Sequence, residues 1–266
     1  MNIHPTAIVD PRAVLGPDAT IGPFAVIEAD VEIGAGCAIG PHVVIHRHTT
    51  VGPQCRIHAG AVLGDLPQDL AFAGAVSQVR IGRDCVIREG VTINRGTKEG
   101  TATVLGAGCY LMANSHLGHN VRLGDQVIVA NGAMLGGYVE VGDRVFVSGN
   151  VLLHQFIRVG RLAMLSGGAG LSKDVPPFCT AHGVTTNAIA GLNLVGLRRA
   201  GLTVEERQQV KRAFDVLYRS GLNVTQAVAV LKKEFTAGPA AEFAPFVEAS
   251  KRGICGFVRG AAEADE

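Results

Sequence analysis

A strict repeat of six residues constrains this chain more than any other feature of its sequence. From Leu105 to Leu171 every sixth residue is Leu or Val, and a second, mostly small residue follows four positions after each. The same register holds from Ile3 to Leu63 and again from Ile81 to Ile93. A period of six fits neither an α-helix nor the simple alternation of a strand. Units that cannot bury their own apolar side must stack, so the pattern predicts a solenoid.

Two interruptions of the repeat predict loops, near residues 65–79 and 97–102. Asp69 would fall on an inward position, so part of the first segment has to leave the solenoid. If six residues loop out near 97–102, one inward column runs from Ile93 through Leu117 to Leu171. The corner beside that column would then gather polar side chains from successive coils. These are Asn94, Arg95, His119, His154 and Gln155.

Composition narrows the classes of function. The net charge of +1 implies no bulk attraction to nucleic acid or to a membrane. We see no signal segment and no apolar run long enough to span a membrane, so we expect a cytoplasmic protein without membrane insertion. Four of the six cysteines occupy the small inward slot of the repeat, which predicts reduced core residues. They are Cys37, Cys55, Cys85 and Cys109.

The repeat gives way to a different pattern near residue 187. We therefore divide the chain into a repeat domain, residues 1–186, and a small C-terminal helical domain, residues 187–266. Thr203 and Glu206 form the sequence of a capping box. Amphipathic patterns predict helices over 204–220, 225–235 and 241–252.

Histidines mark the candidate chemistry. His116 and His119 lie three residues apart, and His154 with Gln155 follows two coils later. A single histidine at a corner is ordinarily a solvent-exposed side chain. Several at one corner indicate an active site, because an imidazole titrates near neutral pH and suits a general base. The residues alone leave both interpretations open.

The repeat resembles that of hexapeptide-repeat acyltransferases, which form a left-handed parallel β-helix with three hexads in each triangular coil. More specifically, the chain resembles the UDP-N-acetylglucosamine O-acyltransferases that begin lipid A synthesis. The stretches that carry this resemblance are residues 68–70, 87–97, 115–119, 154–156, 174–177 and 191–199.

The resemblance implies an activity and roles for individual residues. His119 would be the general base that takes the proton from the 3-hydroxyl of the sugar, which attacks a 3-hydroxyacyl thioester on acyl carrier protein. The N–H of Gly137 would stabilise the oxyanion, Asn120 would sit behind the base, and Gly167 would lie where the acyl tail ends. The positions expected to hold the sugar nucleotide are Gln68, Asp69, Asn94, His116, His154, Gln155, Asn193 and Arg199. The resemblance also implies a homotrimer with sites between neighbouring prisms, and no metal or organic cofactor.

Several positions depart from the family pattern and keep alternatives open. Asn120 replaces an acidic residue, while Asn94 and Tyr138 each replace a histidine. Loss of charge around the base would suit a 3-amino sugar nucleotide as acceptor, or a non-catalytic paralogue. The sister N-acyltransferase of the same pathway fits less well, because it usually carries a domain before the repeats and here they begin at Ile3. A zinc enzyme resembling the hexapeptide carbonic anhydrases would need three histidines at a different spacing.

Overall fold

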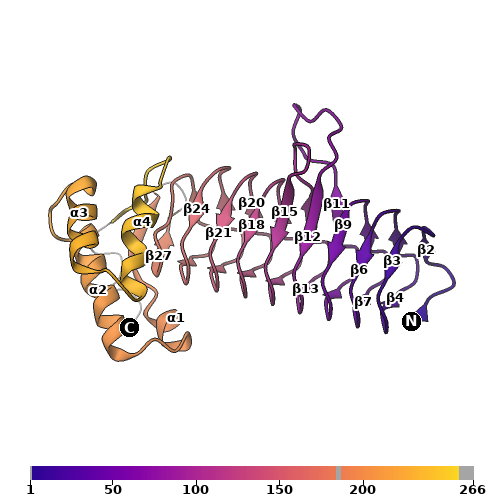
Figure 1. Ribbon diagram of the computed structural model, residues 1–266, viewed down its shortest axis with the longest axis horizontal. Helices are drawn as coiled ribbons and strands as arrows, with labels where there is room; N and C mark the ends of the chain where they lie inside the picture. Colours follow the sequence, from indigo (N-terminus) through magenta and orange to yellow (C-terminus); the bar gives the residue numbers. More distant parts are fainter. Residues whose placement is uncertain (1, 184–186, 258–266) are drawn as a thin grey trace.

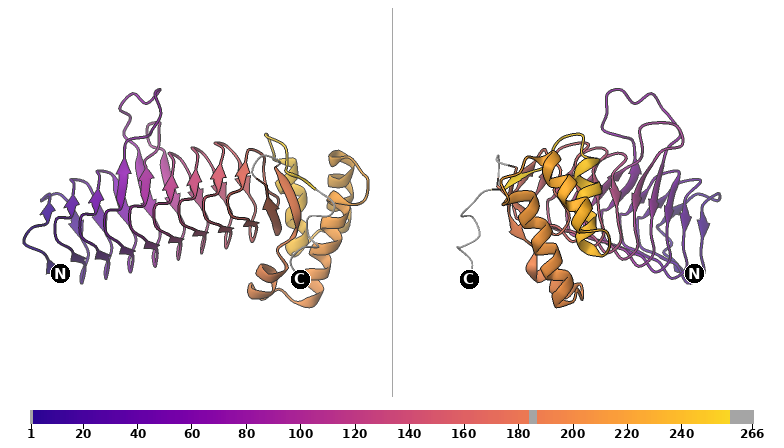
Figure 2. Two further views of the ribbon diagram at one scale, coloured as in Figure 1. Left: turned by 180° about the vertical axis from the view of Figure 1, so that it is seen from behind. Right: turned by 60° about the vertical axis from the view of Figure 1, so that its left-hand side comes forward.

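The fold is a three-sided prism of short strands with helices at one end (Figures 1 and 2). A computed structural model describes residues 2–183 and 187–257. Each turn of the chain adds one strand to each of three parallel sheets, which we call sheets A, B and C. The predicted left-handed parallel β-helix is confirmed.

Sheets B and C form two faces of the prism. Sheet B contains β2 (Ile8–Val9), β5 (Val26–Ile27), β8 (Val44–Ile45), β11 (Val62–Asp65), β14 (Thr92–Asn94), β17 (His116–Leu117), β20 (Met134–Leu135), β23 (Leu152–Leu153) and β26 (Gly170–Leu171). Sheet C contains β3 (Val14–Leu15), β6 (Glu32–Ile33), β9 (Thr49–Val51), β12 (Gln78–Ile81), β15 (Ala102–Leu105), β18 (Arg122–Leu123), β21 (Glu140–Val141) and β24 (Arg158–Val159).

Sheet A forms the third face and continues into the C-terminal part. It contains β1 (Asn2–Ile3), β4 (Thr20–Ile21), β7 (Ala38–Ile39), β10 (Arg56–Ile57), β13 (Val86–Ile87), β16 (Tyr110–Leu111), β19 (Ile128–Val129), β22 (Phe146–Val147), β25 (Met164–Leu165), β27 (Cys179–His182), β28 (Ala188–Leu192) and β29 (Gly256–Phe257). Strand β28 pairs antiparallel with β27, so the sheet reverses its direction where the repeat ends.

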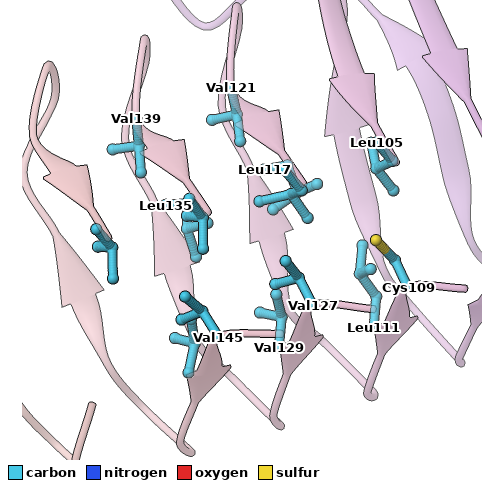
Figure 3. Close-up of a cluster of buried hydrophobic side chains, with 14 of the residues drawn as sticks. Leu105, Cys109, Leu111, Leu117, Val121, Val127, Val129, Leu135, Val139 and Val145 are labelled. Carbon is cyan, nitrogen blue, oxygen red and sulfur yellow. The ribbon is translucent and has the colours of Figure 1, made fainter. Parts of the chain in front are cut away.

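The core is a stack of aliphatic side chains inside the prism. Leu105, Leu117 and Val129 point inward, one from each of the three faces (Figure 3), and are at most 2% exposed. Ile93 pairs with Leu117, and the same column continues through Leu135 to Leu171. This register confirms that six residues loop out between Ile93 and Leu117, because the other steps of the column are eighteen residues.

Both predicted loops leave the prism at the corner between sheets B and C. Residues 66–77 connect β11 to β12, and residues 95–101 connect β14 to β15 (Figure 1). The loops bond to each other: the N–H of Gly100 donates to the carbonyl of Val76 at 2.9 Å, and the N–H of Val76 donates to Glu99 Oε2 at 2.9 Å. They therefore form one projection beside the coils that follow.

The cysteines lie in the core as predicted. Cys37, Cys55, Cys85 and Cys109 are at most 1% exposed, and all six thiols of the chain are free and buried. Burial also raises the pKa of the Cys255 thiol to about 12. Their burial marks these thiols as packing groups.

The C-terminal part contains α1 (Leu194–Arg199), α2 (Val204–Tyr218), α3 (Val224–Glu234), the 3₁₀ helix η1 (Pro239–Glu242) and α4 (Phe243–Glu248). Two of the predicted helices match α2 and α3, and the capping box of Thr203 and Glu206 is present. The prediction of one helix over 241–252 is wrong. A 3₁₀ turn opens that segment, α4 ends at Glu248, and Gly253 adopts a positive φ of 73°.

Helix α1 and the β27–β28 hairpin were not predicted. The hairpin spans the proposed division at residue 187, and residues 184–186 and 258–266 lie outside the described residues. The domain boundaries therefore stay a prediction. None of the helices in the described ranges has the length and apolar character that crossing a membrane requires.

Candidate active site

His119 lies where the chain turns from sheet B to sheet C, between β17 and β18. Leu117 lies two residues before His119, points into the core and is fully buried. The side chain of His119 therefore leaves the prism at its corner. The imidazole is half-buried. Its Nδ1 lies 3.2 Å from Oδ1 of Asn120. A half-exposed ring held by one nitrogen is free to use the other nitrogen on a substrate.

Asn120 is fixed more firmly than the histidine. It is 7% exposed, adopts a positive φ of 60° and donates its backbone N–H to Thr103 Oγ1 at 2.8 Å. Asparagine tolerates this backbone region better than most residues. Its Oδ1 also accepts hydrogen bonds from the backbone N–H and the hydroxyl of Thr97, both at 3.0 Å.

Gly137 lies under the imidazole on the next coil. A Cβ built on this glycine would come closer than 3.0 Å to three atoms of the His119 ring, so no other residue fits without moving the ring. Its carbonyl accepts from the N–H of Phe156 at 3.0 Å, while its own N–H bonds to none of the described residues. An N–H without a partner is able to donate to an oxyanion, so Gly137 remains a candidate for that role.

Three further predicted residues lie at or beside the same corner. His116 stands on the outer face of sheet B, where its Nδ1 lies 2.7 Å from Thr92 Oγ1. Burial lowers its pKa from the ordinary value of 6.5. His154 and Gln155 are exposed two coils later, and His154 Nδ1 lies 3.0 Å from the carbonyl of Gln155. Neutral His116 and exposed His154 both remain able to hydrogen-bond to a polar ligand.

The predicted binding residues in and beside the two loops differ in exposure and in hydrogen bonding. Gln68 is exposed and Asp69 is half-buried on the 66–77 projection, with Asp69 Oδ1 accepting from the N–H of Ala71 at 2.9 Å. Asn94 is 4% exposed, and its amide donates to the carbonyl of Leu66 at 2.8 Å. The pairing of β11 with β14 shifts register between Leu63 and Asp65, so that Asp65 pairs with Asn94. This hydrogen bond ties the first loop to the prism, and the role of Asn94 in binding stays a prediction.

The remaining predicted residues lie at other corners of the prism. Gly167 is exposed between β25 and β26, where sheet A turns into sheet B. Asn193 caps α1 by accepting from the N–H of Gly196 at 2.9 Å, and it donates to the carbonyl of Leu162 at 2.9 Å. Arg199 ends that helix and is exposed. One chain therefore does not bring these three residues to His119.

A groove of about 920 Å³ runs along the outer face of sheet C beside the His119 corner. Asn120, Tyr138 and Phe156 form its edge toward the corner, and basic residues outnumber acidic ones among the charged residues that line the rest. They are Arg80, Arg122, Arg158, Lys251 and Arg252, together with the acidic Glu140 and Asp174. Metal ligands do not gather in the same way: within residues 2–183 and 187–257, no three His, Cys, Asp or Glu side chains are placed to hold an ion.

Comparison with known proteins gives the family. The acyl-[acyl-carrier-protein]–UDP-N-acetylglucosamine O-acyltransferase of Anaeromyxobacter sp. (strain Fw109-5) is 44% identical over 256 residues, which cover 96% of this chain and 99% of that protein. The protein of the same name from Syntrophobacter fumaroxidans is 41% identical, with the same coverage. The chain belongs to the UDP-N-acetylglucosamine O-acyltransferase family.

Solved structures and sequence families agree with this assignment. The UDP-N-acetylglucosamine acyltransferase from Bacteroides fragilis superposes with a TM-score of 0.90 at 38% identity, covering 94% of this chain and 98% of that one. The Francisella novicida enzyme gives 0.92 at 36% identity, covering 97% and 95%. Residues 174–255 match the family described as "Udp N-acetylglucosamine O-acyltransferase; Domain 2", and residues 12–47, 30–65 and 102–137 match bacterial transferase hexapeptide repeats.

Membership of the O-acyltransferase family decides among the alternatives that the sequence left open. The relatives match this chain over nearly their whole length and are named O-acyltransferases. These names favour a hydroxyl acceptor over an amine. The same names favour an enzyme over a non-catalytic paralogue, and an acyltransferase over a zinc enzyme. Neither the N-acyltransferase nor the carbonic anhydrase interpretation gains support.

Two side-chain contacts at the His119 corner were not predicted from the sequence. Thr97 contacts Asn120, and the hydroxyl of Tyr138 lies 2.8 Å from Thr97 Oγ1. Thr97 stands in a predicted loop, and a loop has no periodicity from which contacts can be read. For Tyr138 a signal was available, because it lies eighteen residues after Asn120 and therefore at the same place on the next coil.

Proposed function

We propose that this protein transfers a 3-hydroxyacyl chain from acyl carrier protein to the 3-hydroxyl of UDP-N-acetylglucosamine, with His119 as the general base. The observation that carries the proposal is a half-buried imidazole packed against Gly137, whose N–H is free among the described residues, at a corner of the prism. The base and the oxyanion donor are thus side by side, which acyl transfer requires.

Each group has a defined task in this reaction. The free nitrogen of His119 takes the proton of the sugar hydroxyl as the oxygen attacks the thioester carbonyl. The N–H of Gly137 donates to the oxyanion of the tetrahedral intermediate. When the carbon–sulfur bond breaks, the protonated ring returns the proton to the thiolate that leaves. Atoms and charge balance without a metal or a redox partner.

A homotrimer would complete the site. Gly167, Asn193 and Arg199 are predicted to bind substrate, yet they lie at corners away from His119 in one chain. The outer face of sheet B also exposes apolar side chains: Ile8 is 67% exposed, and Met134 and Leu152 are each 52% exposed. An apolar stripe of this kind is typical of a surface that a partner covers. We therefore propose that the B–C corner of one prism faces a neighbour that supplies Gly167.

The groove on sheet C supports docking of acyl carrier protein. Sheet C carries charged outer residues where sheet B carries apolar ones, which suits a face that stays open to solvent. Five basic and two acidic residues line the groove, so it would attract an acidic protein. Its edge at Asn120 and Tyr138 brings a docked donor beside the base. The buried free thiols accord with the cytoplasmic location expected from the sequence.

Mixed trimers test both the reaction and the assembly. Purified protein should convert UDP-N-acetylglucosamine with 3-hydroxyacyl acyl carrier protein, and His119→Ala and Gly167→Leu should each lose transfer of the longest acyl chain that the wild type accepts. Co-expression of the two variants should restore part of that transfer, because some sites then combine an intact His119 with an intact Gly167 from the neighbour. Absence of transfer by the wild type would refute the activity. Activity without restoration would refute the shared site.

A further inference from the structure

The amide oxygen of Asn120 lies within hydrogen-bond distance of three groups. Its Oδ1 lies 3.0 Å from the backbone N of Thr97, 3.0 Å from the hydroxyl of the same residue and 3.2 Å from Nδ1 of His119. A backbone N–H can only donate, so the atom that faces Thr97 must be the amide oxygen and not the NH₂ group. Two donors on Thr97, the backbone N–H and the hydroxyl, therefore hold the orientation of Asn120 together and independently of the histidine, so that loss of the hydroxyl weakens this orientation.

This orientation determines where the proton sits on His119. An amide oxygen cannot donate, so Nδ1 must carry the hydrogen in the contact with Asn120. In a neutral imidazole the other nitrogen, Nε2, then keeps its lone pair and is the atom able to accept a proton. The reverse orientation of the amide would place an NH₂ group at Nδ1 and select the unproductive tautomer, as an amide does behind the histidine of a serine protease triad.

Tyr138 supports the same arrangement from the next coil. The hydroxyl of Thr97 has a single proton, which it donates to Asn120, so Thr97 accepts from the hydroxyl of Tyr138 at 2.8 Å. The ring of Tyr138 stacks on Phe156, with centroids 5.0 Å apart and planes 14° apart. It also meets the His119 ring edge-on at 5.3 Å. Tyr138 is thus held on two sides while it fixes the hydroxyl of Thr97.

We propose that Thr97 and Tyr138 are positioning residues, which orient the Asn120 amide so that Nε2 of His119 is the base; this rests on the proposed function. This relay of hydrogen bonds between neutral groups keeps an acceptor at Nδ1 of His119. An acidic residue at position 120 would present an acceptor there without such support. A carboxylate presents acceptors on both oxygens and cannot be turned the wrong way. An amide can, and the chain therefore needs Thr97 to hold it.

Kinetics of single and double variants test the relay. Thr97→Val removes the hydroxyl and keeps the backbone N–H, and Tyr138→Phe removes the hydroxyl and keeps the stacked ring. We expect Thr97→Val to lower kcat by about fivefold to twentyfold, the worth of one or two hydrogen bonds, with KM for both substrates unchanged. Thr97→Ser should restore kcat. Thr50→Val, on an exposed threonine of β9, is the matched control.

The double variant distinguishes a relay from two separate contacts. If Tyr138 acts through Thr97, Tyr138→Phe should lower kcat in the wild type and add nothing in the Thr97→Val background. Independent losses that multiply would overturn the relay. So would a Thr97→Val variant with the kcat of the wild type.

A spectroscopic readout separates this inference from the proposed activity. In protein labelled with ¹⁵N-histidine, the ring signals missing from His119→Ala identify His119. We expect them to show a protonated Nδ1 and an unprotonated Nε2 in the wild type, and a mixture of both tautomers in Thr97→Val. A wild-type ring protonated at Nε2 would refute the inference even if acyl transfer is observed. The expected spectrum in a protein without transfer activity would refute the proposed function alone.

Discussion

Gly137→Ala should disable the enzyme by moving His119 while leaving the oxyanion donor in place. The added Cβ would come closer than 3.0 Å to Cε1, Nε2 and Nδ1 of the ring, and ordinary contact begins at 3.4 Å. The ring therefore has to retreat by about 1 Å, a displacement that typically lowers the rate of an enzyme by about 10²-fold. Alanine retains the backbone N–H, so the loss would report the position of the base.

The stability of Gly137→Ala should change much less than its rate. Overpacking a closed core costs about 1–3 kcal/mol, but the half-buried His119 ring can swing toward solvent. We expect the free energy of unfolding to fall by about 1 kcal/mol, which lowers Tm by roughly 2–4 °C in a chain of this size. Steady-state acyl transfer with saturating donor, beside thermal unfolding, measures both quantities.

A second glycine-to-alanine variant controls for the effect of replacing glycine in the backbone. Gly191 lies in β28, and a Cβ built there meets no atom within 4 Å. Gly191→Ala should keep the kcat of the wild type. If Gly137→Ala also keeps it, the close contact between ring and glycine does not matter to catalysis and the reasoning fails.

Three further predictions address neighbouring parts of the site. Burial lowers the pKa of His116 in the folded state, so the unfolded chain binds its proton more readily and stability falls as pH drops below about 6.5. Urea unfolding should therefore show His116→Asn losing less stability than the wild type between pH 7.5 and pH 5; equal losses would contradict this. Gly167→Leu should fold normally, because the nearest atom to its Cβ is 3.6 Å away, and should shift donor preference in acyl-chain competition assays to shorter chains; an unchanged preference would remove Gly167 from the acyl site. Asn120→Asp should move the acid limb of the kcat/KM profile to higher pH, because a carboxylate at Nδ1 of His119 stabilises the protonated ring; an unmoved limb would separate residue 120 from the base.

The repeat predicted most of the architecture because its period determines register. Once six residues were removed near 97–102, eighteen-residue steps placed Leu117 over Ile93 and His119 at a corner. The contacts that could not be predicted are local and have no period. Asn94 occupies the expected coil, but its hydrogen bond to Leu66 depends on the path of the first loop, and Asn193 caps a helix too short to show a pattern.

The hydrogen bonds that hold Asn120 beside His119, the proposed base, could not be predicted from the sequence for a related reason. Thr97 reaches Asn120 only because residues 95–101 fold back over the corner, and loop conformation is not encoded in the hexad pattern. The sequence showed that an amide had replaced an acid at position 120, and that substitution suggested a weakened site. The structure shows that the amide oxygen lies within hydrogen-bond distance of three groups, so its orientation is fixed.

Acyl transfer by His119→Ala tests the central claim most directly. The side chain is half-buried at a corner and not part of the core, so the variant should fold and assemble like the wild type. With 3-hydroxyacyl acyl carrier protein and UDP-N-acetylglucosamine, we predict that kcat falls by about 10²- to 10⁴-fold, the usual contribution of a general base, while KM for the sugar nucleotide stays within about threefold. A folded variant that retains kcat within about threefold of the wild type would contradict the account.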